Sequence, residues 1–146
     1  MAHLTVQALR QRVEAAIVST GTFNRSALVW DSFGRDPSSF GHRSFAVGVP
    51  AGIWTERGRQ KPSVGALVNT TISVRFARKM RIKDQRASYD DALADEHTLI
   101  KTVVGISRTD ITGLVYVDTL RRDVIPDGEW YLGEMTFTAQ HMLALE

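Results

Sequence analysis

Apolar residues spaced three and four positions apart predict a helix near the start of the chain. It runs from about Val6 to Ser19, begins after Thr5, a residue type that caps helices, and ends before Gly21. Its apolar face consists of Val6, Leu9, Val13, Ala16 and Ile17. We therefore expect this face to pack on a core.

The same spacing predicts a second helix from about Ser88 to Gly105. Ser88 and Asp91 resemble a capping box at its start. The residues that can share its apolar face are Tyr89, Leu93, Ile100 and Val104.

A period of two predicts strands, and it is clearest between Val68 and Phe76, where apolar and polar residues alternate. A second alternating segment runs from about Trp130 to Leu143 and follows a turn at Pro126–Gly128. With Ile111–Leu120 before that turn, the last third of the chain reads as a β-hairpin.

Two shorter apolar runs, Ala27–Trp30 and Phe45–Val49, flank a connection rich in Gly, Asp, Pro and Ser at Gly34–Gly41, and read as strand, loop and strand. The chain therefore predicts an α+β fold with a mixed or antiparallel sheet of about four or five strands, packed by two main helices. We expect one domain over residues 1–146, without internal repeats.

Composition changes this picture little. Hydrophobic residues make up 43% of the chain and charged residues 23%, as in ordinary globular proteins. No run approaches 18 consecutive apolar residues, so we expect neither a membrane span nor a signal peptide. The absence of cysteine excludes disulfides and thiolate metal sites, and is compatible with a reducing cytoplasm.

Charge is distributed unevenly along the sequence. Residues 1–86 hold 14 Lys and Arg against 5 Asp and Glu, whereas residues 87–146 hold 4 against 11, so the halves carry +9 and −7. Two surfaces of opposite sign favour head-to-tail association of copies, which closes into rings when the rotation allows it. The alternative is that the two signs mix in the folded chain.

The segment from Pro50 to Pro62 is polar and reads as an exposed loop or arm. Trp54 with Arg57, Arg59 and Lys61 forms a candidate contact element, since aromatic and Arg side chains dominate interface hot spots. The alternative is an ordinary hairpin connection whose Trp packs back on the sheet.

A basic run follows the strand at Val68–Phe76. Its candidate interface residues are Arg78, Lys79 and Arg81, and we expect them to be exposed. The run is compatible with binding to phosphate groups. The alternatives are a solvated connection between strand and helix, or contact with an acidic surface on a neighbouring protein, such as the start of the second helix in another copy.

That acidic start contains Asp90, Asp91 and Asp95, also candidates for an interface. Carboxylates at i and i+4, such as Asp91 and Asp95, share a helix face and suit a divalent cation. The alternative is that acidic residues in the first turns complement the helix dipole. His97 lies beside this cluster. An alternative function of a different class is therefore a small metal-dependent enzyme that uses Asp90, Asp91, Asp95 and His97.

The sequence contains no nucleophile elbow, phosphate-binding Gly loop, dinucleotide-binding fingerprint or zinc-protease motif. We expect a protein that is not an enzyme and needs no cofactor. The basic run makes a nucleic-acid-binding module a further alternative, although the run lacks the interleaved aromatic residues and the reading helix that would favour it.

The order of these elements resembles the tail terminator or tail completion proteins of long-tailed bacteriophages. In both, a helix leads into a sheet, a long strand ends in charged residues, and a helix with a start like Tyr89-Asp90-Asp91-Ala92-Leu93 follows, before a closing hairpin like that ending in Met135–Leu145. The resemblance covers nearly the whole chain.

The resemblance implies a ring, most often a hexamer, that caps the tail tube, stops its polymerisation and presents a docking surface to the head or neck. The implied partners are copies of the chain, the tail tube protein, a head-completion or neck protein, and DNA that passes through the lumen without sequence recognition. The implied location is the virion, assembled in the host cytoplasm. Another neck or connector component, or a tail tube subunit, is the alternative within the same class.

Overall fold

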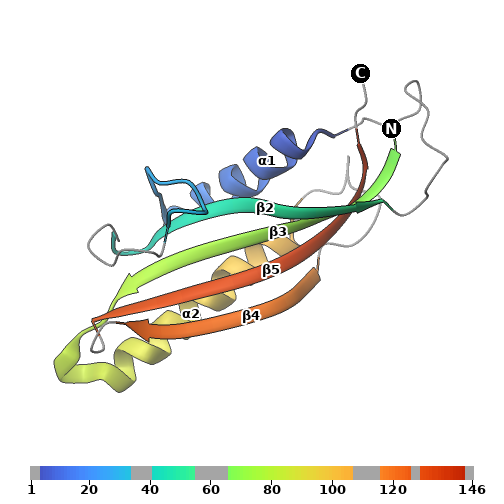
Figure 1. Ribbon diagram of the computed structural model, residues 1–146. Coiled ribbons are helices and arrows are strands. Elements are labelled where there is room, and N and C mark those ends of the chain that lie inside the picture. The colour runs from blue at the N-terminus through green and yellow to red at the C-terminus, as the bar shows by residue number, and fades with distance from the viewer. Residues whose placement is uncertain (1–3, 34–40, 55–65, 107–115, 126–128, 144–146) are drawn as a thin grey trace.

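The computed structural model describes residues 4–33, 41–54, 66–106, 116–125 and 129–143, and its ribbon is shown in Figure 1. The described elements are α1 (Val6–Val18), β1 (Asn24–Arg25), β2 (Ser44–Trp54), β3 (Ala66–Lys79), the 3₁₀ turn η2 (Ile82–Asp84), α2 (Gln85–Val104), β4 (Tyr116–Ile125) and β5 (Trp130–Leu143). No helix among these residues is long and apolar enough to cross a membrane.

The strands form one mixed sheet in the order β1-β2-β3-β5-β4. β1 pairs in parallel with the start of β2, and the other neighbours are antiparallel. The longest ladder joins β3 to β5 and aligns Ala66 with Leu143 and Lys79 with Trp130. The α+β class with about five strands and two main helices is therefore confirmed.

Both helices cover the same face of the sheet (Figure 1). The alternation in β3 and β5 aims every second side chain at them, as the period of two predicts. The core combines residues of α1, α2 and three strands, and its largest fully buried members are Leu9, Ile17, Phe45, Ile72, Phe76, Leu99, Tyr131, Met135 and Phe137.

The start of α1 follows the sequence closely. Thr5 is the N-cap, and its Oγ1 accepts a hydrogen bond from the backbone N–H of Ala8. After the helix, Gly21 adopts a φ of +75°, a conformation that glycine reaches without the steric cost of a Cβ atom. The predicted helix and its ending are confirmed here.

Three predicted boundaries are wrong. Residues 27–30 form turns rather than a strand, and the short strand lies earlier, at Asn24–Arg25. Strand β2 continues through Pro50 to Trp54, so the loop predicted from Pro50 begins later. β4 begins at Tyr116 and extends to Ile125, five residues past the predicted end, while residues 111–115 lie outside the described part.

The buried face of α2 also differs from the prediction. The helix begins at Gln85, and Ser88 lies within it, where its Oγ accepts a hydrogen bond from the N–H of Arg81. Its buried residues are Ser88, Ala92, Asp95, Glu96, Leu99 and Val103. The residues predicted for the apolar face lie beside this buried face. The prediction was wrong because Asp95 and Glu96 are buried, whereas a hydrophobic pattern assigns carboxylates to solvent.

Candidate interaction surfaces

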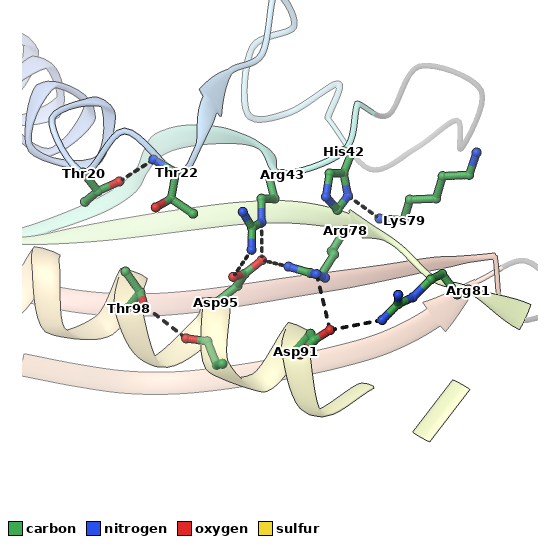
Figure 2. A network of polar contacts seen from close by, with 11 residues as sticks. Thr20, Thr22, His42, Arg43, Arg78, Lys79, Arg81, Asp91, Asp95 and Thr98 are labelled. Carbon is green, nitrogen blue, oxygen red and sulfur yellow. Dashed lines mark hydrogen bonds and ion pairs between the residues drawn. The ribbon is translucent and has the colours of Figure 1, made fainter. Parts of the chain in front are cut away.

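Asp95 lies where α2 crosses the end of β3 and the start of β2 (Figure 2). Its side chain is 8% exposed and forms a 2.6 Å ion pair with Arg78. Arg43 donates to both of its carboxylate oxygens, at 3.2 and 3.3 Å. Burial removes the hydration of this carboxylate, and the two guanidinium groups compensate for that loss.

Asp91, one turn earlier on α2, extends this cluster towards solvent. It lies 3.6 Å from Arg78 and 3.5 Å from Arg81, and its side chain is 49% exposed. The adjacent His42 accepts a hydrogen bond at Nδ1 from the backbone N–H of Lys79. Burial, followed by the neighbouring charges of Arg78 and Arg43, lowers the pKa of His42.

A second buried carboxylate, Glu96, faces the other half of the sheet. Arg122 of β4 binds both of its oxygens, at 2.7 and 2.9 Å, and the hydroxyl of Tyr131 donates to it at 2.9 Å. Burial, with the carboxylate as the next cause, raises the pKa of Tyr131. The phenol therefore stays protonated and can donate this hydrogen bond at neutral pH.

These contacts change the interpretation of the uneven charge. Five ion pairs join a cation from residues 1–86 to a carboxylate from residues 87–146: Arg43–Asp95, Arg78–Asp95, Arg78–Asp91, Arg81–Asp91 and Arg75–Glu134. Four cations of the first part and three carboxylates of the second are thus paired within one chain. The expectation that Arg78 is exposed is wrong, since its side chain is only 13% exposed.

The acidic cluster does not complement the start of the helix dipole, because α2 begins at Gln85 and has no acidic residue in its first turn. Within the described residues, no group of His, Asp and Glu side chains could hold a metal ion. Asp91 and Asp95 do share a helix face, as predicted, but the guanidinium of Arg78 lies between them, and Asp90 is exposed.

The loop at residues 26–33, which we call the Val29 loop, covers part of the helix-free face of the sheet. The ring of Trp30 lies over Gly48, where an added Cβ would be 2.5 Å from the ring, and its Nε1 donates to Ser73 Oγ at 3.0 Å. The guanidinium of Arg75 stacks on the same ring at 3.7 Å and donates to the carbonyl of Trp30. Trp30 thereby fixes this loop against the sheet.

Val29, next to this anchor, is 69% exposed, more than any other large apolar side chain among the described residues. It lies at the β1–β2 side of the sheet. Beside it, Arg10 and Arg25 both bind the single carboxylate of Glu14, at 2.6 and 3.1 Å. This edge therefore combines an exposed apolar side chain with charged groups of both signs, since exposed Asp31 also lies on the Val29 loop.

At the opposite edge of the sheet, a crevice of about 340 Å³ opens between the start of α2 and β4. We call it the β4 crevice, and its lining residues are Met80, Gln85, Arg86, Tyr89, Asp90 and Val124. Tyr89 is 37% exposed and Val124 43%. Neither this crevice nor the exposure of Val29 could be predicted from the sequence, since a periodic pattern does not reveal which single apolar side chains are exposed.

The candidate residues Arg57, Arg59 and Lys61 lie outside the described part of the chain. Trp54 is the last residue of β2, paired with Val68 of β3, and the placement of its side chain is not described. Lys79 is exposed, and the side chain of Arg81 is 68% exposed. Whether these residues contact another molecule stays a prediction.

No protein-family model matches the sequence, and no curated protein matches it significantly. Among solved structures, the fold is similar to a chain in the virion of a native gene transfer agent particle, with a TM-score of 0.54 and 14% identity over 94% of this chain and 95% of the other. A protein of Akkermansia muciniphila, solved without its transmembrane region, gives a TM-score of 0.40 and 12% identity, over 97% of this chain and 88% of the other. The first likeness shows a shared fold, and the second is too low to carry an argument.

Proposed function

We propose that this chain is a structural protein of a phage-like virion, and more specifically a tail terminator that forms a ring on the end of the tail tube. The observation that carries the proposal is the likeness to the chain of the gene transfer agent virion, which extends over nearly the full length of both chains. A neck component or a tail tube subunit belongs to the same class, and the experiment below separates them.

In this proposal the chain does no catalysis. Its buried charges have structural partners: Asp95 binds two arginines, and Glu96 binds an arginine and a tyrosine. Such groups fix one packing of α2 on the sheet, and an assembly protein requires a rigid scaffold of this kind. Its partners would be further copies, the tube protein and a head or neck protein.

The test is removal of the gene from a producing strain, followed by electron microscopy of the particles. If the chain is a tail terminator, we expect its loss to give tubes of irregular and excessive length beside unattached heads. Tails of normal length with unjoined heads would indicate a neck component, and absence of any tube a tube subunit. Normal, infectious particles that lack the chain would contradict the virion function altogether.

A further inference from the structure

Two surfaces at opposite edges of the sheet each combine exposed apolar side chains with charged ones. One is the Val29 loop beside β1 and β2, and the other is the β4 crevice between α2 and β4. Figure 1 shows these elements on opposite sides of the β3–β5 ladder. Because the two surfaces differ, contact between them relates successive copies head to tail, and such contacts close into rings when the rotation between copies allows it.

We propose that the Val29 loop of one copy docks into the β4 crevice of the next copy. This inference rests on the proposed ring function and names the surfaces through which the ring closes. The apolar part of the contact is Val29 against Tyr89 and Val124, all of which are exposed in the single chain. Their burial would remove apolar area from water, which is the main driving force of association.

Each surface has a charged residue beside it, and the two charges are of opposite sign. Arg25, 66% exposed, precedes Val29 in the chain, and among the described residues it shares the carboxylate of Glu14 with Arg10. Asp90 lines the crevice and is in none of the ion pairs found among the described residues. An Arg25–Asp90 pair between copies would neutralise both groups and fix the orientation of docking.

The edges themselves do not favour direct strand pairing between copies. β2 carries Pro50, which has no N–H to donate, and a register shift between Gly48 and Ala51. β4 has a register shift between Val117 and Thr119 and exposes Arg121 and Arg122. Proline, bulges and charges of this kind are the usual protection of edge strands. Docking through side chains is therefore the better supported contact.

The absence of cysteine permits a test without background cross-linking. The variants Val29→Cys and Val124→Cys are purified separately and exposed to oxidant at high concentration. We expect each alone to remain uncross-linked and their mixture to yield a disulfide-linked dimer. A chain with both substitutions should form a ladder that ends at the ring size. Val18→Cys mixed with Val124→Cys is the matched control, since Val18 is 44% exposed but lies outside the loop.

Charge reversal adds a readout of orientation. Arg25→Glu or Asp90→Arg, each in the cross-linking background, should lower the yield about tenfold, and the two together should restore it. Cross-linking of Val29→Cys with itself would indicate a symmetric dimer and overturn the proposal, as would equal yields with the Val18 control.

The inference and the proposed function fail in different ways. Particles that contain the doubly substituted chain but show no ladder would refute this interface and leave the virion function intact. A ladder from a chain that is absent from particles would support the interface and refute the function. If the chain is absent from particles and the concentrated mixture gives no dimer, both are overturned.

Discussion

Asp95 and Glu96 are adjacent in sequence and bind opposite halves of the sheet. Asp95 reaches Arg43, just before β2, and Arg78 on β3, whereas Glu96 reaches Arg122 on β4. Successive residues of a helix point about 100° apart, so the two carboxylates straddle the buried face of α2. Together they fix the rotation of the helix about its axis, which apolar contacts alone specify less strictly.

Replacement of Asp95 by Ala should therefore be costly. It leaves Arg78, largely buried, without its 2.6 Å partner, and breaking a buried pair from one side costs about 3 to 5 kcal/mol. Urea denaturation measures the loss in the free energy of unfolding. Asp90→Ala is the control on the same helix, because Asp90 is exposed, and it should change stability by less than about 0.5 kcal/mol. Equal effects would mean that Asp95 is not paired as described.

His141 gives stability a specific pH dependence. It is fully buried on β5, its Nε2 lies 2.7 Å from Thr70 Oγ1, and burial lowers its pKa below the usual 6.5. Above pH 6.5 the ring is neutral in both the folded and the unfolded chain. As pH falls below 6.5, the unfolded chain binds a proton first, so stability decreases until the lowered folded pKa is reached.

The expected slope from this one residue is at most about 1.4 kcal/mol per pH unit. Urea melts between pH 7.5 and 5.5 should show the decline, and His141→Gln should flatten it while lowering stability overall. The pKa of His42 is also lowered, so His42→Gln measures its separate share. An unchanged slope in His141→Gln would show that this ring does not titrate as its burial requires.

At the scale of elements, the sequence predicted best the helices and strands whose apolar residues follow a regular period. α1, β3 and β5 follow the helical and strand periods, and the structure places their apolar residues in the core. The strand predicted at residues 27–30 failed because Trp30 packs from a loop onto the helix-free face. The face of α2 was missed because its carboxylates find buried partners from strands far away in sequence, which no local pattern reveals.

The register of β3 can be tested by neighbouring substitutions. Ile72 is fully buried opposite Phe137, so Ile72→Ala should cost about 2 to 5 kcal/mol. Thr71, the next residue, points to the other face and is partly exposed, so Thr71→Ala should cost under about 1 kcal/mol. Thermal melting distinguishes the two. The reverse order would mean that the strand is shifted by one residue, since such a slip exchanges the two faces.

At the scale of the whole molecule, the sheet separates two clusters of different size. The main core lies under the helices, while Phe33, Ala46 and Ala77 form a small cluster on the other face with Trp30 and Trp130. Charge, which suggested two opposite surfaces in the sequence, is partly compensated by ion pairs where the two parts of the chain meet. Surface complementarity of the Val29 loop and the β4 crevice depends on this folding and could not be predicted from the sequence.

The two clusters should nevertheless unfold together, because the same strands β2, β3 and β5 contribute to both. Circular dichroism at 222 nm reports the helices on one face. The chain has three tryptophans, so in a Trp54→Phe variant the fluorescence comes from Trp30 and Trp130 on the other face. We expect the two signals to give one urea midpoint, as a two-state domain requires.

Val13→Ala, which opens the core beneath α1 only, should shift both midpoints equally. A shift confined to the dichroism signal would contradict a single cooperative domain, since it would show that the helical layer unfolds while the Trp30 cluster remains on the sheet.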